Sequence, residues 1–145
     1  MKGVYVLILR MTESKDLRIG KLGRLHFRRG YYSYVGSAQG SGGVKRVTRH
    51  FSVAQRKNTT RKWHIDYLLP HSDVICAVFS PTDEAIECVV AKLLGKYSET
   101  LPGFGCSDCS CESHLFFTGG NIMGETSGIC RGVSGNESII IYPNM

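Results

Sequence analysis

The chain has 145 residues, 42% of them apolar and 21% charged, and this balance excludes an intrinsically disordered protein. Its length suits a single domain, which buries roughly 68–70% of the unfolded surface on folding. No apolar run approaches the ~20 residues of a membrane-spanning helix. The formal net charge of +6 favours a polyanionic partner.

Six cysteines and the start of the chain bear on the cellular compartment. Met1 and Lys2 run directly into the apolar residues Val4–Leu9, a segment too short for the apolar core of a secretory signal followed by a cleavage site. We therefore expect a cytoplasmic protein without membrane association. In a reducing cytosol, clustered cysteines favour metal binding or reactivity over disulfides.

Positive charge is concentrated in one window of the sequence. No acidic residue lies between Asp16 and Asp66, a stretch that holds twelve basic ones. They are Arg18, Lys21, Arg24, Arg28, Arg29, Lys45, Arg46, Arg49, Arg56, Lys57, Arg61 and Lys62. A field of one sign attracts polyanions, so the window favours a nucleic-acid-binding surface with salt-sensitive affinity. The alternative interpretation is a solubilising surface.

The first part of the chain predicts strands. Gly3–Leu9 is almost entirely apolar and indicates a central strand. Leu17–Ile19 and Leu25–Phe27 are short strand candidates, and Tyr31–Val35 is a tyrosine-rich strand after Gly30. Because these segments follow one another closely, they favour an antiparallel meander.

A helix is predicted next. Gly36–Gly43 is a Gly- and Ser-rich loop, followed by a helix over Gly43–Ala54 that has an apolar face and a polar stripe. Gln55–Lys62 is a basic loop. Trp63–Leu69 is compatible with a short helix or a short strand before Pro70.

A second strand and helix complete the predicted core. Val74–Phe79 indicates a buried strand. Ser80-Pro81-Thr82-Asp83 has the pattern of a helix start with Ser80 as N-cap, so we predict a helix near residues 83–95. Leu101–Glu112 is a Cys- and Gly-rich loop, and His114–Phe117 a further strand.

The C-terminal residues carry weaker signals. Asn121–Asn136 has little pattern, whereas Ile139–Tyr142 is a candidate edge strand. We assign residues 1–120 to a catalytic domain and residues 121–145 to a C-terminal extension within the same domain. The expected fold is α/β of the α+β type, with a central, mainly antiparallel sheet flanked by helices.

Two tripeptides lie on the first and the last strand of the predicted meander: Gly3-Val4-Tyr5 and Tyr34-Val35-Gly36. A helix with Arg46 and then a helix with Glu87 follow them. This order resembles the GIY-YIG nuclease superfamily over roughly residues 3 to 117. The longer pattern, with Trp-His-Ile-Asp-Tyr-Leu, Pro-Gly-Phe-Gly and Asp-Cys-x-Cys-x-x-His-Leu-Phe, is similar to its Uri-type prokaryotic branch.

The resemblance implies a catalytic set and a reaction. Phosphodiester hydrolysis needs a base, a cation at the phosphate and a metal ion near the leaving oxygen. By resemblance, Tyr5 is the general base, Tyr34 orients water or phosphate, Arg46 contacts the phosphate with Arg49 as the fallback, His50 shares the base role, and Glu87 holds Mg²⁺ or Mn²⁺. A tyrosine acts as a base near neutral pH only if its neighbours lower its pKa, as the basic stripe and a cation would do.

The same residues have ordinary structural interpretations. By residue type alone, Tyr5 and Tyr34 are half-buried sheet tyrosines, Arg46 and Arg49 belong to a solvated face, and Glu87 is a surface carboxylate. The residues expected to contact nucleic acid, most simply DNA, are Lys45, Arg49, Arg56, Lys57, Arg61 and Lys62. Backbone amides of the glycine-rich loop are suited to hold a phosphate at the helix start. His64 and Asp66 either join the site or serve as capping or core groups.

A cysteine cluster is the second candidate site. Cys106, Cys109, Cys111 and His114 supply three thiols and one imidazole, a set that suits tetrahedral zinc, although the spacing matches no common zinc finger. The alternatives are that these residues line the catalytic cleft, pack in the interior or carry redox chemistry.

One position departs from the superfamily pattern. Where many members have an asparagine after the Pro-x-Phe element, Pro102-Gly103-Phe104 is followed here by Gly105, so Ser107 or Asp108 takes that role or the role is absent. The sequence thus predicts a metal-dependent endonuclease acting on DNA. A non-catalytic nucleic-acid-binding module and a zinc-stabilised interaction domain are the alternatives.

Overall fold

The computed structural model describes residues 1–106 and 110–143. A six-stranded sheet lies at its centre, with the order β6-β7-β4-β1-β5-β8 and antiparallel pairing between neighbours. The strands are β1 (Gly3–Met11), β4 (Gly30–Ser37), β5 (Asp73–Pro81), β6 (Glu99–Thr100), β7 (Leu115–Phe117) and β8 (Ile139–Ile141). This architecture confirms the expected α+β fold with a mainly antiparallel central sheet.

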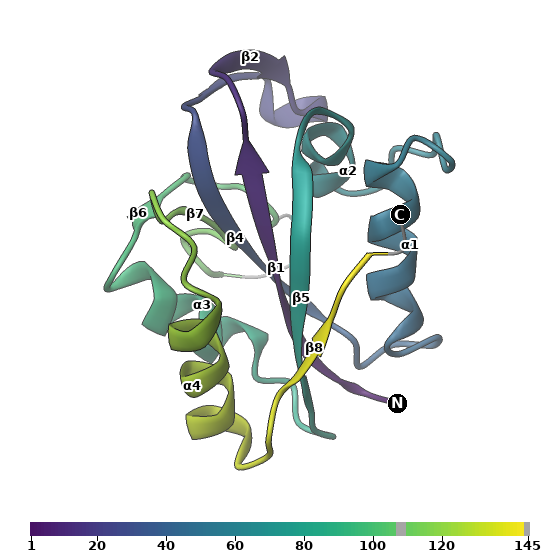
Figure 1. Cartoon of the computed structure of the whole chain (residues 1–145), viewed down its shortest axis with the longest axis vertical. Helices are drawn as coiled ribbons and strands as arrows, with labels where there is room; N and C mark the ends of the chain where they lie inside the picture. Colours follow the sequence, from purple (N-terminus) through teal and green to yellow (C-terminus); the bar gives the residue numbers. More distant parts are fainter. Residues whose placement is uncertain (107–109, 144–145) are drawn as a thin grey trace.

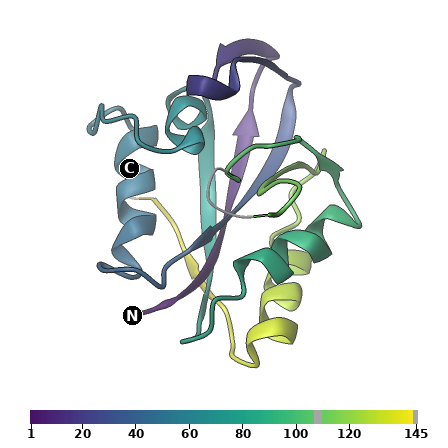
Figure 2. The same ribbon diagram turned by 180° about the vertical axis from the view of Figure 1, so that it is seen from behind.

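Helices cover both faces of this sheet (Figures 1 and 2). One face carries α1 (Lys45–Ala54) and α2 (His64–Leu68), and the other carries α3 (Glu87–Gly95) and α4 (Met123–Ser134). Because side chains of a strand alternate between the faces, Tyr5 and Leu7 of β1 join the core beneath α1 and α2, whereas Val4 and Val6 join the other core. This two-sided burial explains why β1 is almost continuously apolar.

The region after the second tripeptide folds as predicted. The helix expected over Gly43–Ala54 is α1, and Val47 and Phe51 on its apolar face are buried. The segment Trp63–Leu69 forms the short helix α2, which continues into the 3₁₀ helix η2 (Leu69–His71). Strand β5 includes the predicted strand Val74–Phe79.

The predicted antiparallel meander is wrong. β1 pairs directly with β4, while β2 (Lys15–Arg18) and β3 (Arg24–Phe27) form a separate two-stranded sheet around the 3₁₀ helix η1 (Gly20–Leu22). β2 and β3 alternate between half-buried or buried and exposed residues, so they supply only one apolar face. Such short strands cannot replace β4, which is buried over most of its length, beside β1.

The predicted helix start at Ser80 is also wrong. Ser80 and Pro81 belong to β5, where they pair with Val4 and Gly3, and α3 begins only at Glu87. Instead of capping a helix, the Ser80 hydroxyl forms a 2.6 Å hydrogen bond with the Ser134 hydroxyl. Pro81 stands at the last position of the strand, where a missing N–H group costs little.

The C-terminal residues build onto the same two-sided core. α4 lies in a stretch for which the sequence predicted no element, and it buries Thr126 and Cys130. β8 confirms the predicted edge strand, since it pairs with β5 at the end of the sheet. None of the helices within residues 1–106 and 110–143 has the length and apolar character needed to cross a membrane.

Candidate functional site

A cavity of about 180 Å³ opens at the ends of β1 and β4, between α1, α2 and the start of α3. All five residues that the sequence predicted as catalytic line this cavity: Tyr5, Tyr34, Arg46, His50 and Glu87. They come from four separate elements, so their convergence depends on the fold and not on sequence proximity. Trp63, His64, Gly105 and His114 complete much of the wall.

The two tripeptides meet face to face in the sheet. Tyr5 pairs with Gly36 in the β1–β4 ladder, and a Cβ atom at position 36 would overlap the Tyr5 ring and its hydroxyl oxygen. A Cβ at Gly3 would lie 2.6 Å from both the Phe79 ring and the Ser80 carbonyl oxygen. Both glycines therefore leave space for a neighbour, and Gly36 in particular lets the Tyr5 ring lie across the adjacent strand.

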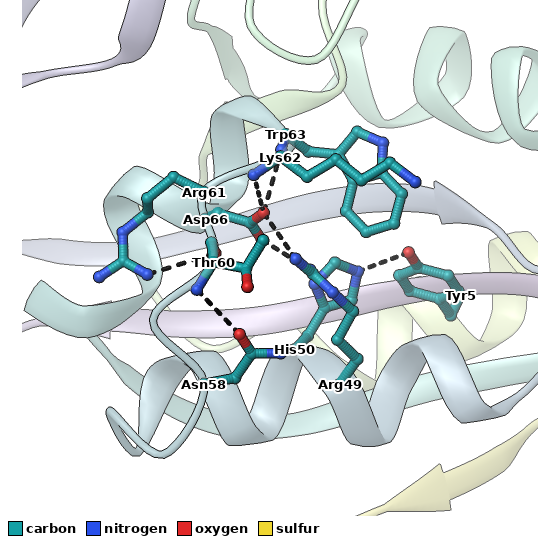
Figure 3. A network of polar contacts seen from close by, with 9 residues as sticks. All are labelled: Tyr5, Arg49, His50, Asn58, Thr60, Arg61, Lys62, Trp63 and Asp66. Carbon is teal, nitrogen blue, oxygen red and sulfur yellow. Dashed lines mark hydrogen bonds and ion pairs between the residues drawn. The ribbon is translucent and has the colours of Figure 1, made fainter.

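A buried hydrogen bond joins Tyr5 to the helix α1. The Tyr5 hydroxyl oxygen and His50 Nε2 are 2.7 Å apart (Figure 3). Tyr5 is 3% exposed and His50 is 1% exposed. Burial lowers the pKa of His50 to about 4, so the imidazole is neutral near pH 7. A neutral ring that accepts the Tyr5 O–H at Nε2 carries its proton on Nδ1, and that buried atom has no hydrogen-bond partner among the described residues.

Burial has the largest effect on the pKa of Tyr5. Burial raises the pKa of Tyr5, although Arg46 and Arg49 act in the predicted, lowering direction. Desolvation of the phenolate outweighs the two nearby guanidinium groups. Tyr5 is therefore a hydrogen-bond donor to His50 at neutral pH and not a preformed tyrosinate.

Arg46 projects from the first turn of α1 into the cavity. Its Nη1 donates to the Ser37 carbonyl oxygen at 2.9 Å, and its guanidinium carbon lies 5.3 Å from the centre of the Trp63 ring. A Cβ at Gly40 would approach Arg46 Nη2 to 2.9 Å, so the glycine-rich loop also shapes the space around this side chain. These contacts hold a planar, permanently charged donor at the cavity wall, as anion binding requires.

Arg49, the fallback phosphate ligand, is engaged differently. Its two terminal nitrogens donate to the two carboxylate oxygens of Asp66 at 2.9 and 3.0 Å (Figure 3). The Asp66 side chain is fully buried and also accepts hydrogen bonds from the backbone amides of Lys62 and Trp63. Asp66 therefore serves as a capping and core group, one of the two roles left open by the sequence, and it anchors the basic loop to α1.

The remaining predicted nucleic-acid ligands lie on α1 and on the loop that precedes Trp63. Lys45, Arg56, Lys57, Arg61 and Lys62 are exposed. Lys62 also places its ammonium group 4.8 Å from the centre of the Trp63 ring. Arg56 has a positive φ of 64° and donates to the Pro70 carbonyl oxygen, so it helps to fix the loop as well as adding charge.

Glu87 is the first residue of α3 and is half-buried at the cavity. Within the part of the chain that the structure describes, no hydrogen bond or ion pair engages its carboxylate. A carboxylate that lines a polar cavity without a protein partner fits a hard divalent cation, which in proteins is often held by one or two carboxylates, waters and substrate phosphate. The residues present thus fit the Mg²⁺ or Mn²⁺ expected from the resemblance.

A second group of side chains, formed by Cys88, Cys111 and His114, could hold a metal ion. Their ligand atoms all lie within 4.8 Å of one another, and Cys88 Sγ is 3.9 Å from His114 Nε2. This set shares Cys111 and His114 with the predicted zinc cluster but includes Cys88, which no spacing rule pointed to. Cys106 is a described residue outside the group, and Cys109, like Ser107 and Asp108, lies outside the described residues.

Three further residues of the site were not predicted as functional from residue type. Trp63 is surrounded by the cations of Arg46, Arg49 and Lys62, and its only signal in the sequence is the Trp-His-Ile-Asp pattern. Gly105, at a φ of +76°, donates its amide to His64 Nδ1 at 2.9 Å and packs against Tyr34. Cys88 has no nearby cysteine in the sequence, so no local pattern could have indicated it.

Comparison with known proteins gives one positive result. A family model described as a domain of unknown function, DUF123, matches residues 4–133. No curated protein and no solved structure matches the chain.

Proposed function

The chain belongs to the DUF123 family, whose model spans residues 4–133, and we propose that it is a metal-dependent endonuclease of the GIY-YIG type that cleaves DNA. One observation carries this proposal: Tyr5, Tyr34, Arg46, His50 and Glu87, which come from four elements, line a single cavity. Phosphodiester hydrolysis uses a base, a permanent cation and a carboxylate that can hold a metal ion.

The Tyr5–His50 pair supplies the base in this proposal. Because burial raises the pKa of Tyr5, a free tyrosinate is unfavourable, and Tyr5 acts through its hydrogen-bond partner. As Tyr5 Oη takes a proton from the attacking water, the Tyr5 proton passes to His50 Nε2 over 2.7 Å. Burial and the charges of Arg49 and Arg46 disfavour the imidazolium formed in this relay, and the charge of Asp66 offsets part of that cost, so His50 holds the proton only transiently.

Arg46 and Glu87 deal with charge on the phosphate. Arg46 already has its position fixed by Ser37 and Trp63, so little side-chain ordering remains when a phosphate binds. Glu87 would hold Mg²⁺ or Mn²⁺, and the bound ion would offset negative charge on the leaving oxygen. Tyr34, which lies edge-on to both His50 and Phe104, orients water or phosphate from the opposite wall.

DNA reaches this cavity over a basic surface. Lys45 and Lys62, the exposed sequence neighbours of the cavity residues Arg46 and Trp63, supply positive charge next to it. Such contacts position the backbone without reading its sequence. A cytoplasmic location, expected from the six cysteines, agrees with an intracellular nucleic acid as the substrate.

The test is a nuclease assay with Mg²⁺ or Mn²⁺ on duplex, branched and single-stranded DNA. We expect Tyr5→Phe and Glu87→Gln to lower single-turnover cleavage about 100-fold or more. Tyr32→Phe is the matched control, because Tyr32 is also a buried sheet tyrosine but donates to the Arg28 carbonyl oxygen away from the cavity. Equal, weak cutting by wild type and Glu87→Gln would mean contamination and would refute the endonuclease. Binding without cutting would instead select the non-catalytic module.

For the group formed by Cys88, Cys111 and His114, we propose Zn²⁺ as the ion. Two thiolates and one imidazole match the soft and borderline ligands that zinc takes in tetrahedral sites, whereas Mg²⁺ prefers oxygen. Zinc here adds a structural site to the endonuclease. If no DNA is bound or cut, the same site would support the third interpretation, a zinc-stabilised interaction domain.

A further inference from the structure

The metal-binding group joins segments that are distant in sequence. Cys88 is the second residue of α3, Cys111 belongs to the loop between β6 and β7, and His114 immediately precedes β7. In a tetrahedral zinc site, metal–ligand bonds of about 2.0–2.3 Å place ligand atoms roughly 3.5–4 Å apart. The 3.9 Å between Cys88 Sγ and His114 Nε2 already meets this spacing.

His114 is oriented for metal binding by β4. Its Nδ1 lies 3.1 Å from the Val35 carbonyl oxygen, which can only accept, so Nδ1 carries the proton and Nε2 presents a lone pair toward Cys88. A backbone hydrogen bond of 2.9 Å from the Val35 amide to the His114 carbonyl oxygen strengthens the same link. Metal-ligating histidines commonly donate their second nitrogen to a carbonyl in this way.

The same group borders the catalytic cavity. Glu87 precedes Cys88 in α3, and Tyr34 and Gly36 flank Val35 in β4. His114 itself lines the cavity together with Glu87. Cys88 and Cys111 also line a second cavity of about 550 Å³ on the outer side of the group, which gives an ion a route from solvent.

The start of α3 is held by the burial of Ile86 but has no side-chain cap. Ile86 occupies the N-cap position, and no side chain there accepts a hydrogen bond from the backbone amides of the first turn. Glu87 is in that first turn. Its position relative to Tyr5 and Arg46 therefore depends on the neighbouring Cys88 as well as on the buried Ile86.

We propose that the zinc ion at Cys88, Cys111 and His114 is a tether that fixes the start of α3 to β4 and thereby positions Glu87 for its divalent cation. Cys88 is a positioning residue in this arrangement and does not contact the substrate. The inference rests on the proposed function for the identity of the Glu87 cation. It adds that zinc at one site sets the affinity for Mg²⁺ or Mn²⁺ at the other.

The first measurement is metal content and ligand type in the freshly purified, reduced full chain. We expect one zinc per chain in wild type and in Cys106→Ser, and loss of zinc in Cys88→Ser and Cys111→Ser. Cys106 is a matched control because it is a half-buried cysteine of the same loop outside the group. Replacement by Co²⁺ should give thiolate-to-cobalt absorption in wild type that Cys88→Ser weakens. Zinc-free wild type without this absorption overturns the proposal.

The second measurement is Mn²⁺ binding, followed by the electron paramagnetic resonance signal of free Mn²⁺ and without any DNA. Binding that Glu87→Gln abolishes should weaken about tenfold or more in Cys88→Ser, as expected when a group that orients a metal ligand is removed. Cys88→His, which keeps a zinc ligand, should restore it. Wild type can also be stripped of zinc by a Zn²⁺-selective chelator and then reloaded with zinc. Comparing its Mn²⁺ affinity in the two states tests the same coupling without a substitution.

The outcomes separate the two proposals. Equal Mn²⁺ affinity with and without zinc, or no Glu87-dependent Mn²⁺ binding in wild type, overturns the tether. Zinc-dependent Mn²⁺ binding in a protein that never cuts DNA supports the tether while refuting the endonuclease. Cleavage by wild type that is unchanged in Cys88→Ser supports the endonuclease and overturns the tether.

Discussion

Gly36 lies directly opposite Tyr5 in the β1–β4 ladder, and the Tyr5 ring occupies the space that a side chain at position 36 would fill. The two tripeptides are therefore one packing unit. The glycine of the second motif permits the ring position of the first, and that position brings the Tyr5 hydroxyl to His50. A motif written as two separate strings in the sequence describes a single cross-strand contact.

Replacing Gly36 by alanine should displace the Tyr5 ring. The added methyl group overlaps ring atoms in a closely packed sheet, so we expect a loss of about 1–3 kcal/mol in the free energy of unfolding and a large loss of cleavage. Urea unfolding and single-turnover cleavage measure the two effects. Gly128→Ala is the control, because a Cβ there would have no atom within 4 Å apart from the nearby backbone of its own helix, and alanine at this exposed position of α4 should stabilise the protein by about 0.5–1 kcal/mol. Unchanged activity in Gly36→Ala would contradict the packing unit.

The Arg49–Asp66 pair should show strong energetic coupling. Asp66 is fully buried and Arg49 is 21% exposed, so removing either partner leaves a desolvated charge or unpaired amides. A double-mutant cycle with Arg49→Ala and Asp66→Ala, measured by urea unfolding, should give a coupling energy of about 1–3 kcal/mol. The exposed Arg10–Asp73 pair, at 46% and 59%, should give less than about 1 kcal/mol. Equal coupling in both cycles would show that Asp66 does not anchor the loop.

Local patterns were sufficient where packing agreed with them. The apolar run of β1, the apolar period of α1 and the paired tripeptides all reflect burial that the structure contains. The resemblance that the tripeptides carry named five residues in advance, and all five line one cavity. At Ser80 the local pattern failed. Its helix-start signal competed with pairing to Val4 in the central sheet, and the pairing prevailed because it extends a buried strand.

Other features arise only from tertiary structure. α4 has glycines at positions 124, 128 and 132, which lower helix propensity and obscure the period of its buried residues. Contacts of its apolar face with the core beneath α3 stabilise the helix. Cys88 joins Cys111 and His114 through folding alone, and the raised pKa of Tyr5 follows from a depth of burial that residue types do not reveal.

The loop before Trp63 should contribute to DNA affinity through charge. Lys57 and Arg61 are exposed on this loop, so replacing both by alanine should weaken binding to DNA of any sequence. The slope of log affinity against log salt should fall by about one for each phosphate that the variant no longer neutralises. Fluorescence anisotropy at several salt concentrations measures both. Lys96→Ala is the control, since this exposed lysine follows α3, on the face of the sheet opposite α1. An equal effect of Lys96→Ala would argue for unspecific attraction.

His50 should make the stability of the protein depend on pH in a defined interval. Burial lowers its pKa from 6.5 to about 4, so between these values the unfolded chain binds a proton that the folded chain excludes. The free energy of unfolding should therefore rise with pH from about 4 to 6.5 and level off above, a change of roughly 3 kcal/mol. Asp66 affects stability in a different pH range. Its pKa is lowered from 3.8, so its contribution to the free energy of unfolding is lost only at more acidic pH.

The variant that isolates this effect is His50→Gln, which keeps a hydrogen-bond partner for Tyr5 but does not titrate. Urea unfolding of wild type and His50→Gln between about pH 4 and pH 8 should give curves that diverge above pH 4 and run parallel above pH 6.5. His64 and His71, whose pKa values burial also lowers, titrate in both proteins and cancel in the difference. Parallel curves throughout would mean that His50 has the same pKa in the folded and unfolded chains, which would contradict a buried, neutral imidazole in the folded protein.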